Sequence, residues 1–157
     1  MNHPFLKSIP KQDPLIMETE FDASPERVFK AWTSVEDILQ WFGSGDGGPD
    51  RASVDLRVDG KWQFVFVDKD GHSDYLSGQY LNIEPNKLLE FSWAHTRVMA
   101  DGSEQITPKP KVTITFEPRE NRCFLRLVHK SISTDSAREN IIGGWGASLI
   151  KMKGLVE

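Results

Sequence analysis

The sequence is poor in cysteine and has no long apolar segment. Cys123 is the only cysteine among 157 residues, which excludes an intramolecular disulfide and a cysteine-based zinc site. No apolar run approaches the roughly 18 residues that a membrane-spanning helix requires. The first 14 residues hold three prolines and two lysines but no apolar core of a signal peptide. We therefore expect a cytoplasmic protein without a membrane partner.

Neither sign of charge dominates, and the common catalytic signatures are missing. Lys and Arg total 19 against 23 Asp and Glu, a formal net charge of −4, which gives no reason to expect a nucleic-acid partner. The GxSxG, HExxH and Walker A motifs do not occur. We expect no catalytic residue, no metal and no cofactor.

One glycine-rich segment has the spacing of a dinucleotide-binding loop. GSGDGG at 43–48 satisfies GxGxxG, but a helical pattern precedes it where that fingerprint needs a strand. We interpret it as a flexible loop, with the gating of a neighbouring cavity as an open alternative.

The length fits one folded domain. A chain of 157 residues hides roughly 70% of its unfolded surface and needs no disulfide or metal to fold. Prolines favour a flexible lead-in over residues 1–13, and no repeat or linker divides residues 14–157. We expect a single domain over 14–157, as a monomer or a homodimer.

Hydrophobic spacing predicts a strand, two short helices, about six strands and a long helix, in that order. Ser24 followed by Pro25 is typical of a helix start, and Ser34 with Asp37 resembles a capping box for a second helix. A polar stretch over 95–110 interrupts the strand patterns. This order predicts an α+β fold, an antiparallel sheet with its helices on one side.

Two stretches of the predicted sheet allow more detailed expectations. Val54, Leu56 and Val58 alternate with charged residues, so we expect a strand over 51–59. The segment 68–71, Asp-Lys-Asp-Gly, is typical of a solvated hairpin turn and lacks the further ligands of a calcium loop.

The last predicted helix, about 135–153, contains three glycines that are costly inside a helix. Gly143, Gly144 and Gly146 are expected to permit a close approach to a strand or to break the helix. Cys123 is in phase with Leu125 on an alternating strand, which favours a buried structural thiol.

The chain carries five Trp, two Tyr and nine Phe, a heavy aromatic load for a small domain. Period-two spacing places many of these rings on one face of the sheet, and the last helix must cover that face. Core packing accounts for many of them. So many large planar rings around a glycine-rich helix also favour an apolar cavity.

Six segments match a known family in order and spacing: FDASPERVFKAWTSVEDILQWFG (21–43), VDGKWQFVFVDKDG (58–71), GQYLNIEPNKLLEFSW (78–93), VTITFEP (112–118), LRLVH (125–129) and GGWG (143–146). Together they resemble the SRPBCC superfamily (START-like, helix-grip fold), within it the family of the C-terminal domain of the activator of the 90-kDa heat-shock protein ATPase. Asp59-Gly60 stands where that family usually has Gly-Gly. The resemblance covers about 14–155 and implies two short helices after the first strand and a curved antiparallel sheet wrapped around a long C-terminal helix. It also implies a mostly apolar cavity that takes a small hydrophobic ligand in many relatives.

The leading hypothesis is a non-enzymatic protein whose cavity, between the sheet and the last helix, binds a small hydrophobic or aromatic molecule. The residues expected to contact this ligand are Trp62, Phe66, Tyr80, Phe91, Trp93, His129, Trp145 and Leu149. His129 is in phase with Leu125 and Leu127, so it is expected at the inner rim of the cavity as the polar anchor.

Two alternatives remain open. A chaperone-associated interaction protein with a role in the stress response is the first, although the 13-residue lead-in is too short for the separate chaperone-binding domain of the eukaryotic co-chaperone. An enzyme resembling the polyketide cyclases and dehydratases is the second and weaker one, because it would need a polar catalytic pair inside the cavity.

Overall fold

The computed structural model describes residues 15–43, 48–106, 111–130 and 135–157. The predicted lead-in and the centre of the glycine-rich loop, 44–47, lie outside them. In chain order the elements are β1 (Leu15–Phe21), α1 (Pro25–Thr33), α2 (Val35–Trp41), β2 (Arg51–Val54), β3 (Lys61–Val67), β4 (Ser73–Glu84), β5 (Leu88–Ser92), β6 (Ala94–Val98), β7 (Glu104–Ile106), β8 (Lys111–Arg119), β9 (Arg122–Lys130) and α3 (Asp135–Val156).

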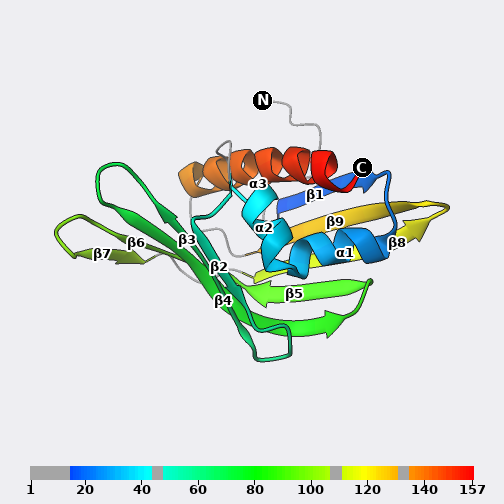
Figure 1. Ribbon diagram of the computed structural model, residues 1–157, viewed down its shortest axis with the longest axis horizontal. Helices are drawn as coiled ribbons and strands as arrows, with labels where there is room; N and C mark the ends of the chain where they lie inside the picture. Colours follow the sequence, from blue (N-terminus) through cyan, green and yellow to red (C-terminus); the bar gives the residue numbers. More distant parts are fainter. Residues whose placement is uncertain (1–14, 44–47, 107–110, 131–134) are drawn as a thin grey trace.

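The described strands form one sheet of nine antiparallel strands. Its main path is β1-β9-β8-β5-β4-β3-β2, while β6 pairs with β4 and with β7. Figure 1 shows the three helices grouped on one side of this curved sheet, with the long α3 running beside β1. Fully buried residues such as Met17, Trp41 and Leu149 lie between the two layers. The predicted α+β helix-grip fold is confirmed.

Strand β4 links the two halves of the sheet. Its first half pairs with β6 and its second half with β5, and the register shifts between Tyr80 and Asn82. This bulge changes the alternation: Tyr80 is buried, Leu81 is 40% exposed, and Ile83 packs against the core again. Gly78 precedes the bulge, where a Cβ would lie 1.9 Å from the carbonyl oxygen of Ser92. Only glycine fits there.

A side chain caps α1 as predicted, but the capping box of α2 does not form. Ser24 Oγ accepts a hydrogen bond from the backbone N–H of Arg27 at 3.2 Å. Ser34 begins α2 without a side-chain cap. The Asp37 carboxylate instead accepts a hydrogen bond from the Arg27 guanidinium at 2.8 Å. Asp37 is buried between the helices, so pairing with a cation compensates for its lost hydration better than a backbone N–H would.

Helix α3 is continuous through its glycines. A Cβ built on Gly143 or Gly144 would meet no atom within 4 Å, so the expected close approach to a strand is wrong for these two glycines. The far end of α3 is tied to β1: Lys153 Nζ donates to the Glu20 carbonyl and lies 4.9 Å from the centre of the Phe21 ring. None of the described helices is both long and apolar enough to cross a lipid bilayer.

The strand predicted over 51–59 ends early. β2 stops at Val54, and a turn follows in which Gly60 N–H donates to the Arg57 carbonyl at 2.8 Å. Leu56 and Val58 are 43% and 54% exposed. The alternation with charged residues therefore indicates a solvated turn here, because these side chains have no covering layer.

The polar stretch over 95–110 does not interrupt the sheet. β6 and β7 lie within it and extend the sheet beyond β4, as Figure 1 shows. Residues 107–110 lie outside the described chain. The hairpin predicted at 68–71 is confirmed, with Asp68 Oδ1 accepting from the backbone N–H groups of Asp70 and His72.

Candidate ligand site

The residue that ends α2 joins the helices to the sheet. The N–H of Phe42 closes the helix by donating to the Ile38 carbonyl at 3.1 Å, and its extended backbone turns the ring inward. The ring centre then lies 4.7 Å from that of Phe64 on β3 and 5.7 Å from that of Trp145 on α3. Phe42 is therefore the meeting point of three elements.

Trp93 lies between β5 and β6, opposite the part of β4 that contains Gly78. Its ring centre is 5.7 Å from that of Trp62 and 5.3 Å from that of Trp145. The imidazole of His129 packs edge-on against it, with 5.7 Å between ring centres. The position between the two strands thus places one indole in contact with Trp62 on β3, His129 on β9 and Trp145 on α3.

His129 is fully buried on β9 and does not lie at a rim. Its Nδ1 accepts a hydrogen bond from the indole Nε1–H of Trp145 at 3.0 Å. This bond leaves the ring proton of the neutral imidazole on Nε2. The alternation along β9 correctly placed His129 inward, but the covering α3 makes the position an interior one.

A small internal space lies between the end of the helices and the inner face of the sheet. It is lined by eight aromatic side chains and one leucine: Trp32, Trp41, Phe42, Trp62, Phe64, Tyr80, Leu89, Phe91 and Trp93. The volume open to the centre of a water molecule is about 20 Å³, which is room for about one water. The rings therefore nearly fill the interior.

The structure brings together some of the sequence-predicted site residues around this space. Trp62, Tyr80, Phe91 and Trp93 line it. Trp145 and His129 lie behind Trp93, Phe66 contacts Phe42 with 6.3 Å between ring centres, and Leu149 belongs to the packed core. The lining residues that the sequence analysis did not single out are Trp32, Trp41, Phe42, Phe64 and Leu89. The motif FKAWTSVEDILQWF, with one aromatic pair three residues apart and one adjacent pair, was the signal for three of them.

The chain matches one protein family over almost its whole length. Residues 22–157 match the family described as Activator of Hsp90 ATPase homolog 1-like protein. The chain belongs to this family. No curated protein sequence matches it significantly.

Solved structures of bacterial proteins have the same fold as this family member. A protein from Chromobacterium violaceum superposes with a TM-score of 0.72 at 24% identity, covering 93% of this chain and 99% of its own. One from Nitrosomonas europaea gives 0.73 at 19%, covering 90% and 92%. One from Mycobacterium smegmatis gives 0.73 at 16%, covering 99% and 98%. At these identities the likeness establishes the fold alone.

In this member of the Activator of Hsp90 ATPase homolog 1-like family, Ser148 ties the start of the glycine-rich loop to α3. Its Oγ accepts from the backbone N–H of Gly43 at 2.9 Å and lies 2.7 Å from the carbonyl oxygen of Gly144, to which it can donate. Gly43 has a φ of +104°, a conformation that side chains rarely adopt. The loop therefore leaves the end of α2 at a fixed point.

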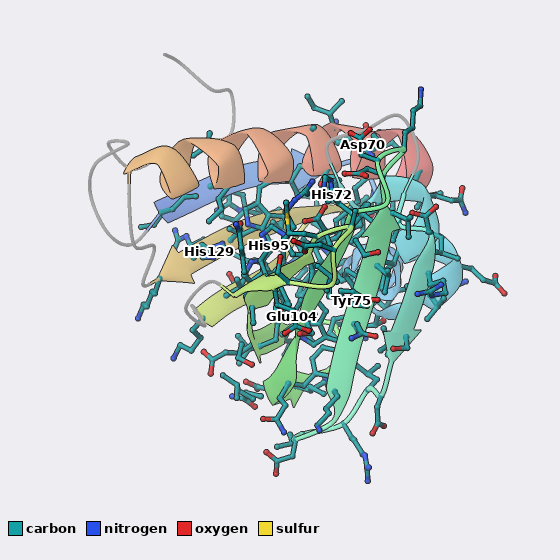
Figure 2. The ribbon with its side chains drawn as sticks, turned by 90° about the vertical axis from the view of Figure 1, so that its left-hand side faces the viewer. Asp70, His72, Tyr75, His95, Glu104 and His129 are labelled. Atoms are coloured by element: carbon teal, nitrogen blue, oxygen red, sulfur yellow. The ribbon has the colours of Figure 1, made fainter. Side chains whose placement is uncertain are left out.

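A charged network continues the inner face of the sheet beyond the aromatic residues. Arg97 on β6 donates to the carboxylates of Asp74 at 2.7 Å and Asp68 at 3.0 Å, and His95 Nε2 lies 2.7 Å from Asp74. Figure 2 shows His95 between His129 and the hairpin that carries His72. Burial raises the pKa of Asp68, but hydrogen bonds from the backbone of His72 and Asp70 and from Arg97 outweigh it, so the pKa lies below its usual value.

The same hairpin carries a group of metal-ligand types. One ligand atom each from Asp68, Asp70 and His72 lies within 4.8 Å of the others. Asp68 is already engaged by Arg97 and by two backbone N–H groups. Its carboxylate is thus committed to the hairpin and to β6.

Two buried acidic groups remain protonated at neutral pH. Burial raises the pKa of the Tyr80 hydroxyl, which lies in the wall of the internal space. Burial also raises the pKa of the Cys123 thiol to about 11, as expected for a structural cysteine. Both groups are poor nucleophiles in this state.

Proposed function

We propose that this protein is a non-enzymatic binding protein that takes a small, flat, apolar molecule between the sheet and its covering helices. The observation that carries the proposal is the lining of the internal space, which is aromatic at eight of nine positions. Ligand sites in proteins are mostly apolar with few polar groups, and aromatic rings offer planar surfaces for a planar ligand. Membership of the family supports a ligand-binding or chaperone-associated role.

Occupation of the site requires the aromatic walls to separate. A space of about 20 Å³ for water centres is far below the several hundred Å³ of a typical ligand pocket. The first half of α3 is suited to move, because Gly143 and Gly144 lower its helical stability and nothing packs where their side chains would be. Outward movement of this half would also carry Trp145 away from Phe42 and Trp93.

The proposal is tested by titrating the protein with naphthalene and indane while following tryptophan fluorescence and the melting temperature. We expect saturable binding and a rise in the melting temperature, because a ligand that binds only the folded state stabilises it. Leu89→Phe fills the space and should abolish binding while the protein stays folded. Ile150→Ser changes a side chain that is 57% exposed and should leave binding unchanged. Absence of saturable binding by the unaltered chain would refute the proposal.

A chaperone-associated role is the second candidate, and a surface feature favours it beside the family name. Leu56, Val58 and Leu81 are 43%, 54% and 40% exposed. The turn after β2 bonds to Tyr80 through Asp59 N–H at 2.8 Å, which brings this turn alongside Leu81. Exposed apolar residues gathered on one edge are typical of a partner surface.

The ATPase rate of Hsp90 with and without the protein tests this second candidate. Stimulation that is lost in the double variant Leu56→Ser, Val58→Ser and retained in Ile150→Ser would establish the surface role. The cyclase-like alternative gains no such observation, since Tyr80 supplies the single hydroxyl in the lining.

A further inference from the structure

Four tryptophans are almost completely buried, and the fold supplies hydrogen-bond acceptors to two of them. Trp41 Nε1 donates to the carbonyl oxygen of Ala31 at 2.7 Å. Trp145 Nε1 donates to Nδ1 of His129 at 3.0 Å. Buried indole N–H groups normally find such partners, because an unpaired donor loses its hydration without compensation.

The other two tryptophans depart from this pattern. Trp32 on α1 is 5% exposed and Trp62 on β3 is 3% exposed. Both Nε1 atoms are buried, and neither has a hydrogen-bond partner among the described residues. Both side chains line the internal space, one from the helical layer and one from the sheet. Both tryptophans with an unpaired indole N–H are thus in the walls of the proposed site.

The backbone explains why no side chain reaches the N–H of Trp62. Its directly opposed residue on β4 is Gly78. A Cβ at that position would lie 2.9 Å from Trp62 Nε1 and 1.9 Å from the Ser92 carbonyl oxygen. The close approach of the strands therefore forbids any side chain at residue 78 that could accept the hydrogen bond.

We infer that the ligand is a flat apolar ketone, or a related neutral carbonyl compound, whose oxygen accepts a hydrogen bond from the indole N–H of Trp62, of Trp32 or of both. This inference rests on the proposed function and specifies the chemistry of the ligand. We infer a neutral ligand and not a carboxylate, because the lining contains no charged side chain that could compensate a buried negative charge. A bound water could satisfy the same donors, because its oxygen accepts hydrogen bonds and the space has room for one.

The test compares indanone with indane, two molecules of nearly the same shape that differ in one carbonyl group. We expect the ketone to bind about fivefold to tenfold more tightly in calorimetric titration, the usual effect of one hydrogen bond to a buried donor. Saturation with indanone should shift the indole proton resonance of Trp62 or Trp32 downfield in a ¹⁵N-labelled sample. Indane should not produce this shift.

Single substitutions identify the donors. Trp62→Phe and Trp32→Phe remove an unpaired N–H, so the two together should abolish the preference for the ketone. Trp41→Phe is the matched control, because its N–H is already bonded to Ala31 and the preference should persist. The indole resonances provide the same answer without any substitution if a variant fails to fold.

Three results would overturn the inference. Equal affinity for indane and indanone would mean that water satisfies the donors, while the proposed binding function would stand. A ketone preference that persists without both N–H groups would assign recognition elsewhere. Failure of both compounds to bind would refute the proposed function together with the inference.

Discussion

The indole of Trp145 on α3 and the imidazole of His129 on β9 form a buried hydrogen bond, with 3.0 Å between Nε1 and Nδ1. It connects the covering helix directly to the inner face of the sheet. Trp93 packs against both rings, so this pair also forms the back of the aromatic site.

Removing the acceptor should destabilise the protein. His129→Leu leaves the Trp145 N–H buried without its acceptor, which should lower the free energy of unfolding by about 1–3 kcal/mol. In a double-mutant cycle with Trp145→Phe, urea denaturation should give a coupling energy of about 1 kcal/mol. His129→Gln retains an acceptor and should lose less. Strictly additive single effects would show that the bond contributes nothing.

Helix α3 should become more stable when its glycines are replaced. No atom lies within 4 Å of a Cβ built on Gly143 or Gly144, so alanine fits at both positions. Each substitution should raise the free energy of unfolding by about 0.5–1 kcal/mol in urea denaturation. Gly78→Ala is the contrasting control and should destabilise, because its Cβ would collide with the Ser92 carbonyl. A loss of stability in Gly143→Ala would contradict the assignment of open space.

The thiol of Cys123 should make the protein less stable in alkaline solution. Its pKa rises from 9.0 to about 11 on folding, because burial disfavours the thiolate. The unfolded chain therefore releases this proton first, and the contribution of the protonated thiol is lost as the pH rises through 9 to 11. Urea denaturation across this range should show a decline that Cys123→Ala reduces. Parallel declines in both proteins would exclude the thiol as the cause.

The sheet could be predicted where one face is apolar and not where ion pairs replace apolar contacts. Alternation along β3, β5 and β8 identified these strands because every second side chain enters the core. On β6 the inward positions are His95 and Arg97, which bond to Asp74. Hydrophobic spacing carries no signal for such a strand.

Sequence spacing also identified lining residues on the sheet but not those on the side of the helices. The sheet residues Trp62, Phe91 and Trp93 were expected from period two, and they line the internal space. Trp32 lies on α1 and Phe42 directly after α2, and the spacing singled out neither of them for the site. Which helical ring meets which strand depends on where α2 ends and how it crosses the sheet, and spacing along the chain does not contain that information.

The hydrogen bond between Ser148 and the backbone of Gly43 should hold Gly43, just after α2, against α3. Ser148 is 2% exposed, and its Oγ lies 2.9 Å from the Gly43 nitrogen. Ser148→Ala removes the acceptor and leaves a partly buried N–H unpaired, so it should cost about 1–2 kcal/mol of unfolding free energy. Hydrogen exchange at the Gly43 amide, followed by NMR, should become faster than exchange in neighbouring helical amides.

Ser92→Ala is the matched control, because Ser92 Oγ also accepts from a backbone N–H at 2.9 Å, that of Gln79, but at an exposed position. That variant should cost less and leave the Gly43 amide as protected as before. If Gly43 stays equally protected in Ser148→Ala, the Gly43 amide is held by other contacts, and Ser148 serves only the packing of α3.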